Sequence, residues 1–255
     1  MSAGHTHALY VPRDTYVHRL PPHCKLAAVI AFVLVVVATP REAFWAFGVY
    51  AGLLVAVAVT ARIPPGTVAR RMVVELPFVL FAVLLPFVSR GPQVEVLGVG
   101  LSESGLLGAW NILAKGTLGV VASILLAATT QPRALLLGVE RLHLPPLMVQ
   151  IMTFMLRYVD VVGGELARMK VARESRAFQG RDLRHLKVVA QSAGALFIRS
   201  YERGERVHLA MLSRGYTGTM PDVHDIRADR SQWTAASALP VLAAMVAVAA
   251  WTVRW

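Results

Sequence analysis

The sequence has little charge and almost no cysteine. Only 16% of its 255 residues are charged, whereas a soluble domain carries about a quarter. The single cysteine, Cys24, excludes an intramolecular disulfide and a cysteine-based metal site. Acidic residues are the scarcer kind, 15 against 26 Lys and Arg, for a net charge of +11. In so weakly charged a chain this excess indicates loops that face anionic lipid, and no basic surface interleaved with aromatics points to nucleic acid.

The signatures of several enzyme classes are also missing. The sequence contains no G-x-x-x-x-G-K-[ST] phosphate loop, no H-E-x-x-H and no G-x-S-x-G, so the chain cannot hydrolyse ATP by itself. The amino terminus has no basic segment followed at once by an apolar core, and we expect no cleaved signal peptide. His5 and His7 have side chains that bind cobalt or nickel, but a tail without a metal role is the commoner case, and we assign no metal site.

Long apolar runs are abundant. Hydrophobic residues make up 56% of the chain and its mean hydropathy is +0.55, which predicts an all-α, polytopic integral membrane protein. We expect Pro77 and Pro86 to kink the third run, the spacing Gly48-x-x-x-Gly52 to allow close helix approach, and residues 89–104 to form a loop. The five predicted transmembrane helices are Leu26–Ala38, Ala43–Ala61, Met72–Val88, Leu106–Ala128 and Ala235–Val253.

The stretch from 129 to 232 has a different character. Between Arg157 and Arg230 it holds fourteen Arg and Lys residues, and burying them at about 2.5 kcal/mol each would cost tens of kcal/mol. We therefore expect it at the cytoplasmic surface of the cell membrane. The basic residues predict that the amino terminus is also cytoplasmic and the carboxyl terminus external. The predicted organisation is 1–128 with four membrane helices, 129–232 at the surface, and 233–255 as the last membrane helix.

Two long amphipathic helices are predicted in the surface region, at 147–178 and 186–215. Both end in a Ser-Arg-small-aromatic signature, "SRAF" at 175–178 and "SRGY" at 213–216. An arginine at a helix carboxyl end also simply favours the helix dipole, and basic helices bind anionic lipid; neither reading explains the repetition. Small residues predict that the two helices cross at close range, and these residues are Gly163, Gly164, Ala193, Ser200 and Gly204.

A family resemblance rests on four segments. They are "VHRLPPHCKL" (17–26), "TTQPRALLLGVERLHLP" (129–145), "LRYVDVVGGELARMKVARESRAF" (156–178) and "FIRSYERGERVHLAMLSRGYTG" (197–218). In this order they resemble the transmembrane T components of energy-coupling factor (ECF) transporters, above all the cobalt-type, CbiQ-like branch. The last segment is the most specific, since it looks like the second coupling helix of that family.

The resemblance implies a non-catalytic coupling subunit. In that family two short Ala-Arg-Gly-type motifs end the coupling helices, and each arginine inserts into a groove on one of two ATP-binding-cassette ATPases. Carried over, Arg176 and Arg214 are the inserting residues. Their flanking residues are Ser175 and Ala177, and Ser213 and Gly215. The first copy departs from the family pattern, because Ala stands at 177 where Gly is commoner.

The resemblance also implies the partners. The two ATPases bind ATP, this chain binds no cofactor, and a separate membrane subunit captures the substrate. Cobalt is the substrate preferred by the branch, with nickel or a vitamin as alternatives. Arg203 and Arg206 are expected to be ordinary basic surface residues.

Two readings from other classes stay open. One is an intramembrane enzyme acting on lipids, for which Glu75 and Lys115 are the only candidate ionisable groups. The other is a membrane scaffold whose basic helices bind anionic lipid. Co-purification with a pair of ATPases would separate the coupling subunit from both.

Overall fold

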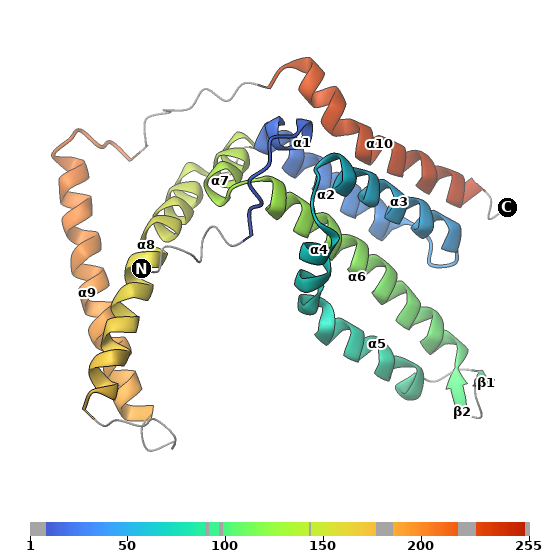
Figure 1. Ribbon diagram of the computed structural model, residues 1–255, viewed down its shortest axis with the longest axis horizontal. Helices are drawn as coiled ribbons and strands as arrows, with labels where there is room; N and C mark the ends of the chain where they lie inside the picture. Colours follow the sequence, from blue (N-terminus) through green and yellow to red (C-terminus); the bar gives the residue numbers. More distant parts are fainter. Residues whose placement is uncertain are drawn as a thin grey trace. The chain divides into compact units, whose positions relative to one another are not determined.

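The computed structural model describes residues 9–89, 92–96, 99–142, 144–176, 186–218 and 228–252, and these are predominantly helical (Figure 1). The predicted all-α membrane protein class is therefore confirmed. The chain divides into two units. One, at 143–225, contains the long helices α8 (Pro146–Glu174) and α9 (Leu186–Leu212). The other, which we call the membrane-helix unit, contains every other element at 9–142 and 226–255.

The membrane-helix unit is built mainly from apolar helices. Its elements are α1 (Tyr16–Arg19), α2 (Pro22–Ala38), α3 (Phe44–Thr60), α4 (Pro65–Arg71), the 3-10 helix η1 (Met72–Glu75), α5 (Leu76–Val88), β1 (Gln93–Val96), β2 (Val99–Ser102), α6 (Glu103–Thr129), α7 (Pro132–Arg141) and α10 (Arg230–Thr252). The stretch 129–142, which the sequence assigned to the surface region, contributes α7, and this helix packs against α2.

In the described part of the chain, four helical segments are long and apolar enough to cross a membrane. Three of them, 65–88, α6 and α10, contain predicted spans. The other two predicted spans form α2 and α3, which are apolar helices of 17 residues; at about 1.5 Å per residue each covers roughly 26 Å. The fourth is α8. We predicted no membrane helix in this surface region, whereas α8 has the length and composition of one, because only Arg157 and Asp160 carry charge between 146 and 163.

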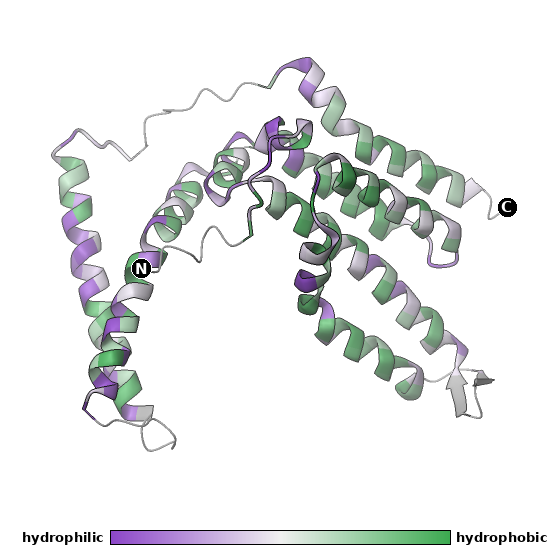
Figure 2. Cartoon of the chain, viewed as in Figure 1, coloured by the Kyte–Doolittle hydropathy of each residue, from purple (hydrophilic) through white to green (hydrophobic). Residues whose placement is uncertain are grey.

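The core of the membrane-helix unit lies among α2, α3, α6 and α10. Phe32 and Tyr50 are fully buried there, and the Tyr50 hydroxyl lies 2.8 Å from Thr39 Oγ1 and donates to the carbonyl of Ala243 at 3.4 Å. Many large apolar side chains of α5 and α10 are exposed instead, and Figure 2 shows α5 as hydrophobic along its length and α10 as hydrophobic beyond its polar first turns. Such outer faces suit contact with lipid.

Glycines bring α6 and α7 against their neighbours. A Cβ at Gly105 of α6 would lie 2.7 Å from the Cα of Pro86 in α5, and a Cβ at Gly138 of α7 would lie 2.9 Å from the His23 nitrogen. Only a residue without a side chain allows such backbone approach. The Gly48-x-x-x-Gly52 spacing has no such role, since no described atom lies within 4 Å of a Cβ at either position.

The third predicted span is interrupted before its first proline. The chain changes from α4 to the 3-10 helix η1 and then to α5, and Pro77 lies in the first turn of α5, where proline is tolerated. Pro86 lies inside α5 near its end. The loop expected at 89–104 contains instead the antiparallel pair β1 and β2, followed by the start of α6, which Ser102 caps by accepting from the Gly105 N–H at 3.4 Å.

Candidate functional site

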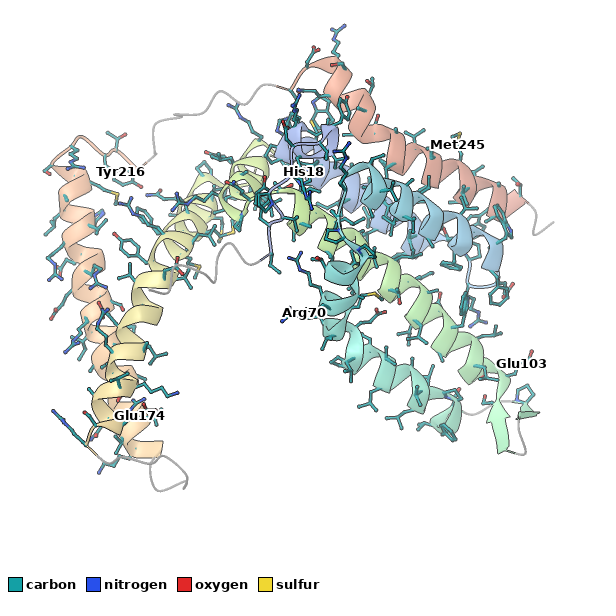
Figure 3. All side chains as sticks on the ribbon, in the orientation of Figure 1. His18, Arg70, Glu103, Glu174, Tyr216 and Met245 are labelled. Atoms are coloured by element: carbon teal, nitrogen blue, oxygen red, sulfur yellow. The ribbon has the colours of Figure 1, made fainter. Side chains whose placement is uncertain are left out.

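The two long helices α8 and α9 form an antiparallel pair. Three side-chain bridges join them, and the α9 residue number falls as the α8 number rises. The bridges link Gln150 to Tyr216, Glu165 to Arg203, and Arg173 to Ser192. Figure 3 labels Glu174 and Tyr216 at opposite ends of this pair. The pairing was predicted from small residues, whereas the structure makes it with polar side chains.

The bridges differ in burial. Glu165 is buried and forms an ion pair with the guanidinium of Arg203, which is half-buried. Toward either end of the pair, Arg173 Nη1 donates to Ser192 Oγ at 2.7 Å, and the Tyr216 hydroxyl donates to Gln150 Oε1 at 2.8 Å. Arg203 is thus not the ordinary surface charge that the sequence predicted.

An apolar groove of about 340 Å³ lies between the helices. Ser200 and Gly204 line it from α9, so these two predicted contact residues do face α8. The close contact expected at the glycines is absent among the described residues: nothing lies within 4 Å of a Cβ at Gly163 or Gly204. A Cβ at Gly164 would meet only Arg168 Nη1 of its own helix, at 3.6 Å, and Ala193 is exposed.

The carboxyl end of α8 is a compact hydrogen-bonded turn. The Ser175 N–H donates to the Val171 carbonyl at 2.9 Å, and the Ser175 hydroxyl donates to the Ala172 carbonyl at 3.0 Å. The Arg176 N–H then donates to the Arg173 carbonyl at 3.1 Å. The serine therefore satisfies a last-turn carbonyl that the helix itself leaves free, and the arginine follows directly at the tip.

The carboxyl end of α9 repeats this geometry bond for bond. The Ser213 N–H donates to Leu209 at 3.0 Å, its hydroxyl donates to Ala210 at 3.0 Å, and the Arg214 N–H donates to Met211 at 3.0 Å. Both ends thus share the spacing Ala-x-x-Ser-Arg, and the repeated signature in the sequence is a repeated local structure.

After the second arginine the chain reverses through a glycine. Gly215 has φ = +82°, and its N–H donates to Leu212 at 3.0 Å. The Tyr216 N–H donates to Met211 at 3.1 Å, which completes the Schellman pattern of a helix carboxyl end. Glycine takes this left-handed conformation without steric cost. The corresponding Ala177 lies outside the described residues.

Both arginine side chains are available to a partner. Arg176 and Arg214 are exposed, and neither forms an ion pair with any residue that the structure describes. The 27 residues of α9 extend about 40 Å at 1.5 Å per residue, so the antiparallel arrangement holds the two guanidinium groups tens of ångströms apart.

No candidate metal site accompanies these ends in the described part of the chain. No group of three His, Cys, Asp or Glu side chains there can hold a metal ion, and His5 and His7 lie outside it. Glu75 is buried and accepts a hydrogen bond from Thr117, while Lys115 Nζ donates to the Val37 carbonyl at 2.7 Å. Each of the two groups considered for an intramembrane enzyme therefore has a structural partner of its own.

The three bridges were not predicted from the sequence. The bridging residues Gln150, Glu165 and Arg173 share one face of α8, whose positions 150–154–158–162–165–169–173 recur every three or four residues. That periodicity was readable, but a polar position on such a face does not reveal its partner in another helix.

Comparison with known proteins supports the family resemblance of the sequence over most of the chain. Residues 13–224 match the family CbiQ, described as cobalt transport protein. An energy-coupling factor transporter transmembrane protein EcfT of Bacillus selenitireducens is 29% identical over 226 residues, 82% of each chain. The EcfT protein of Listeria innocua is 27% identical over 224 residues, 82% of this chain and 83% of its own. An uncharacterized protein of Methanocaldococcus jannaschii, MJ1089, is 37% identical over 102 residues, 40% of this chain and 38% of its own. The chain therefore belongs to the CbiQ family of transporter membrane subunits.

Proposed function

We propose that this chain is the coupling subunit of an ECF-type ABC importer. It transmits ATP-driven motion from two ATPases to a membrane subunit that captures the substrate. One observation carries the proposal: the same Ala-x-x-Ser-Arg helix end occurs twice, and each end of the helix pair has an exposed arginine that forms no ion pair with a described residue. The EcfT names of the relatives, which refer to energy-coupling factor transporters, support it.

The arginine is suited to docking. A guanidinium stays charged at physiological pH and binds a carboxylate through two parallel hydrogen bonds, which fixes direction as well as affinity. The serine before each arginine directs its own hydroxyl back into the helix, so it presents little bulk at the tip. Each end of the pair therefore offers one directed cation for an acidic groove on one ATPase.

The antiparallel pair converts ATPase movement into helix movement. Two ATPases that approach one another on binding ATP would carry Arg176 and Arg214 with them. Because α8 and α9 are joined by side-chain bridges and not by backbone contact at their glycines, a change in their mutual angle would not disrupt a close backbone contact at those glycines. In this scheme ATP is bound by the ATPases, and this chain holds no cofactor.

Cobalt(II) is the proposed substrate. The description of the matching family as cobalt transport protein supports cobalt, whereas the EcfT names specify no substrate. Nickel and a vitamin are the alternatives, since the capturing subunit selects the cargo. Uptake of labelled cobalt by cells that express the complete transporter tests the choice. Cobalt would be contradicted as the substrate if a tenfold excess of unlabelled nickel inhibited the uptake of labelled cobalt more strongly than the same excess of unlabelled cobalt.

The proposed orientation places the amino terminus and α8–α9 in the cytoplasm and the carboxyl terminus outside. It follows from the basic residues, which include Arg168, Lys170 and Arg173 in α8 itself, and it requires that α8 does not cross the membrane despite its spanning length. The only native cysteine, Cys24, is fully buried, so an introduced cysteine can be labelled against a low background. We expect an impermeant maleimide to label a cysteine added after Trp255 in intact cells, and Ser231→Cys only after the cells are opened. Labelling of both from the same side would contradict the topology.

Co-purification tests the function itself. The tagged chain is expressed with two ABC ATPases and a candidate capturing subunit, solubilised in mild detergent and isolated. We expect both ATPases to remain bound when the complex is washed with 0.5 M salt, because desolvated charge pairs resist screening better than surface pairs. Each ATPase should be recovered at about a 1:1 ratio to the tagged chain. A chain that is recovered without ATPases, from cells in which cobalt uptake still depends on it, would contradict the proposal.

A further inference from the structure

Two cavities adjoin one another in the membrane-helix unit. One is polar, has a volume of about 400 Å³, and is lined by Tyr10, His18, Lys25, Thr130, Gln131 and Gln232 among others. The other is apolar, has a volume of about 310 Å³, and is lined by Val29, Leu53, Val57, Leu125 and Leu239 among others. Leu20, Lys25 and Thr129 line both cavities, so the two lie directly side by side.

The polar cavity is built for an anion. Lys25 is only 7% exposed, and its Nζ donates to the Thr129 carbonyl at 2.9 Å, which uses one of three donors. Thr130 is 4% exposed, and its hydroxyl has no partner in the described structure. Buried polar groups are normally hydrogen-bonded, so an unused hydroxyl that lines the same cavity as a buried ammonium group indicates a ligand that accepts hydrogen bonds.

Among the described residues that line either cavity, none carries a carboxylate. The neighbouring Asp14 is already paired, because Arg19 binds both of its carboxylate oxygens at 2.7 Å. This pairing holds the pKa of Asp14 below its ordinary value. The positive charge of Lys25 is therefore left for a ligand.

Two helix amino termini add positive potential, while the negative carboxyl end of α6 at Thr129 is capped by Lys25 Nζ. Pro22 begins α2, Ala134 lies in the first turn of α7, and both line the polar cavity. The unpaired N–H groups at a helix amino terminus favour negative charge. Together with Lys25 and Thr130 they form a site that suits a phosphate group.

We propose that these cavities bind one anionic phospholipid, with the phosphate in the polar cavity and an acyl chain in the apolar one. Their position supports this occupant: α2 and α10 begin here and α6 ends here, which is the depth of lipid headgroups if these helices span the membrane. In the proposed orientation this end faces the cytoplasmic leaflet. The lipid would contact the amino-terminal segment and the helices α2, α6 and α10, and would hold them together.

Native mass spectrometry of the purified chain in neutral detergent tests the site. The probes are phosphatidylglycerol and phosphatidylcholine with identical acyl chains. We expect phosphatidylglycerol to be retained as one tightly held adduct, and Lys25→Met to weaken its binding by about tenfold or more, the usual effect of losing a hydrogen bond to a charged group. Lys115→Met is the matched control, because Lys115 also donates to a backbone carbonyl but lines neither cavity, and it should leave binding unchanged.

A second pair of variants tests the apolar cavity without removing charge. Ala56 is exposed on α3 and lines it, whereas Ala51 is exposed on the same helix and does not. Ala56→Trp should reduce phosphatidylglycerol retention and Ala51→Trp should not. Equal retention of both lipids, or retention unaffected by both Lys25→Met and Ala56→Trp, would overturn the proposal. Displacement by millimolar inorganic phosphate together with a neutral Ala56→Trp would show a free-anion site and would also overturn it.

Discussion

The helices within each of the two units are joined to one another in different ways. In the membrane-helix unit, α6 and α7 meet their neighbours backbone to backbone at Gly105 and Gly138. In the α8–α9 unit, polar side chains join the helices at intervals beside an open apolar groove. Backbone contact fixes the distance between two helices, whereas long side chains tolerate changes in it. The first arrangement suits an anchor in the membrane, and the second suits a part that moves with its partners.

The largest expected effect sharpens this contrast by separating function from stability. Truncating one member of a desolvated charge pair costs about 2 to 5 kcal/mol, and reversing its charge costs more. Arg214→Glu should therefore abolish cobalt uptake. It should leave the amount of chain in the membrane fraction and its thermal unfolding temperature unchanged, because Arg214 is exposed and pairs with no described residue. A variant that transports normally would contradict the docking role.

Arg176→Glu should act in the same direction with a smaller loss of uptake. The two ends share their serine and arginine hydrogen bonds, but Ala177 follows the first arginine where the second is followed by Gly215. Uptake rates of the two variants, measured side by side at equal expression, check the order. If Arg176→Glu reduced uptake more than Arg214→Glu, the carboxyl end of α8 would be the more important docking site.

Gly105→Ala should damage the membrane-helix unit and spare the ATPase contacts. Its Cβ would lie 2.7 Å from Pro86 Cα, and overpacking of this kind costs about 1 to 3 kcal/mol. The measurement is the thermal unfolding temperature in detergent, which should fall. Gly119→Ala is the matched control on the same helix, because no described atom lies within 4 Å of its Cβ. Equal effects of the two changes would contradict the close contact.

Arg203→Ala should loosen the α8–α9 pair by leaving the buried Glu165 without its cation. We expect faster proteolysis within 186–218 and reduced uptake, with unchanged thermal unfolding of the membrane helices. Combining Arg203→Ala with Glu165→Gln should recover part of the resistance, since no buried charge is then left unpaired. A double variant as sensitive as Arg203→Ala alone would argue against the bridge.

Gly204→Ala should have the smallest effect, and its sign should be favourable. The groove leaves room for the added methyl group, and alanine stabilises a helix interior by up to about 1 kcal/mol relative to glycine. Resistance of the α8–α9 unit to protease should be equal or slightly higher. A marked loss of resistance would restore the close glycine contact that the sequence predicted.

The sequence predicted the fold class and most of the membrane helices, because long apolar runs leave few alternatives. It also located both arginine ends, since a local signature such as Ser213-Arg214-Gly215 needs no knowledge of distant contacts. It missed the spanning length of α8, because the charge of the following segment dominated the interpretation of its apolar first half.

Contacts between distant residues were harder to predict. Gly105, Gly163 and Gly204 are all glycines within helices and look alike in the sequence. Of these three, only Gly105 lies against the backbone of another helix. Periodicity shows which residues share a face and not what the face meets. For the same reason Arg203 was read as a surface charge, since its partner Glu165 lies 38 positions away.

The central claim is that two arginines, and not the general basic surface, hold the two ATPases. The most direct test is the amount of ATPase retained by Arg176→Glu, Arg214→Glu, the double variant and Arg206→Glu in a nucleotide-free pull-down. Arg206 is exposed on α9 and pairs with no described residue, so its reversal changes net charge equally. We expect Arg206→Glu to retain wild-type levels, each of the other single variants to lose at least one ATPase, and the double variant to lose both. Equal losses with Arg206→Glu and Arg214→Glu would contradict the account.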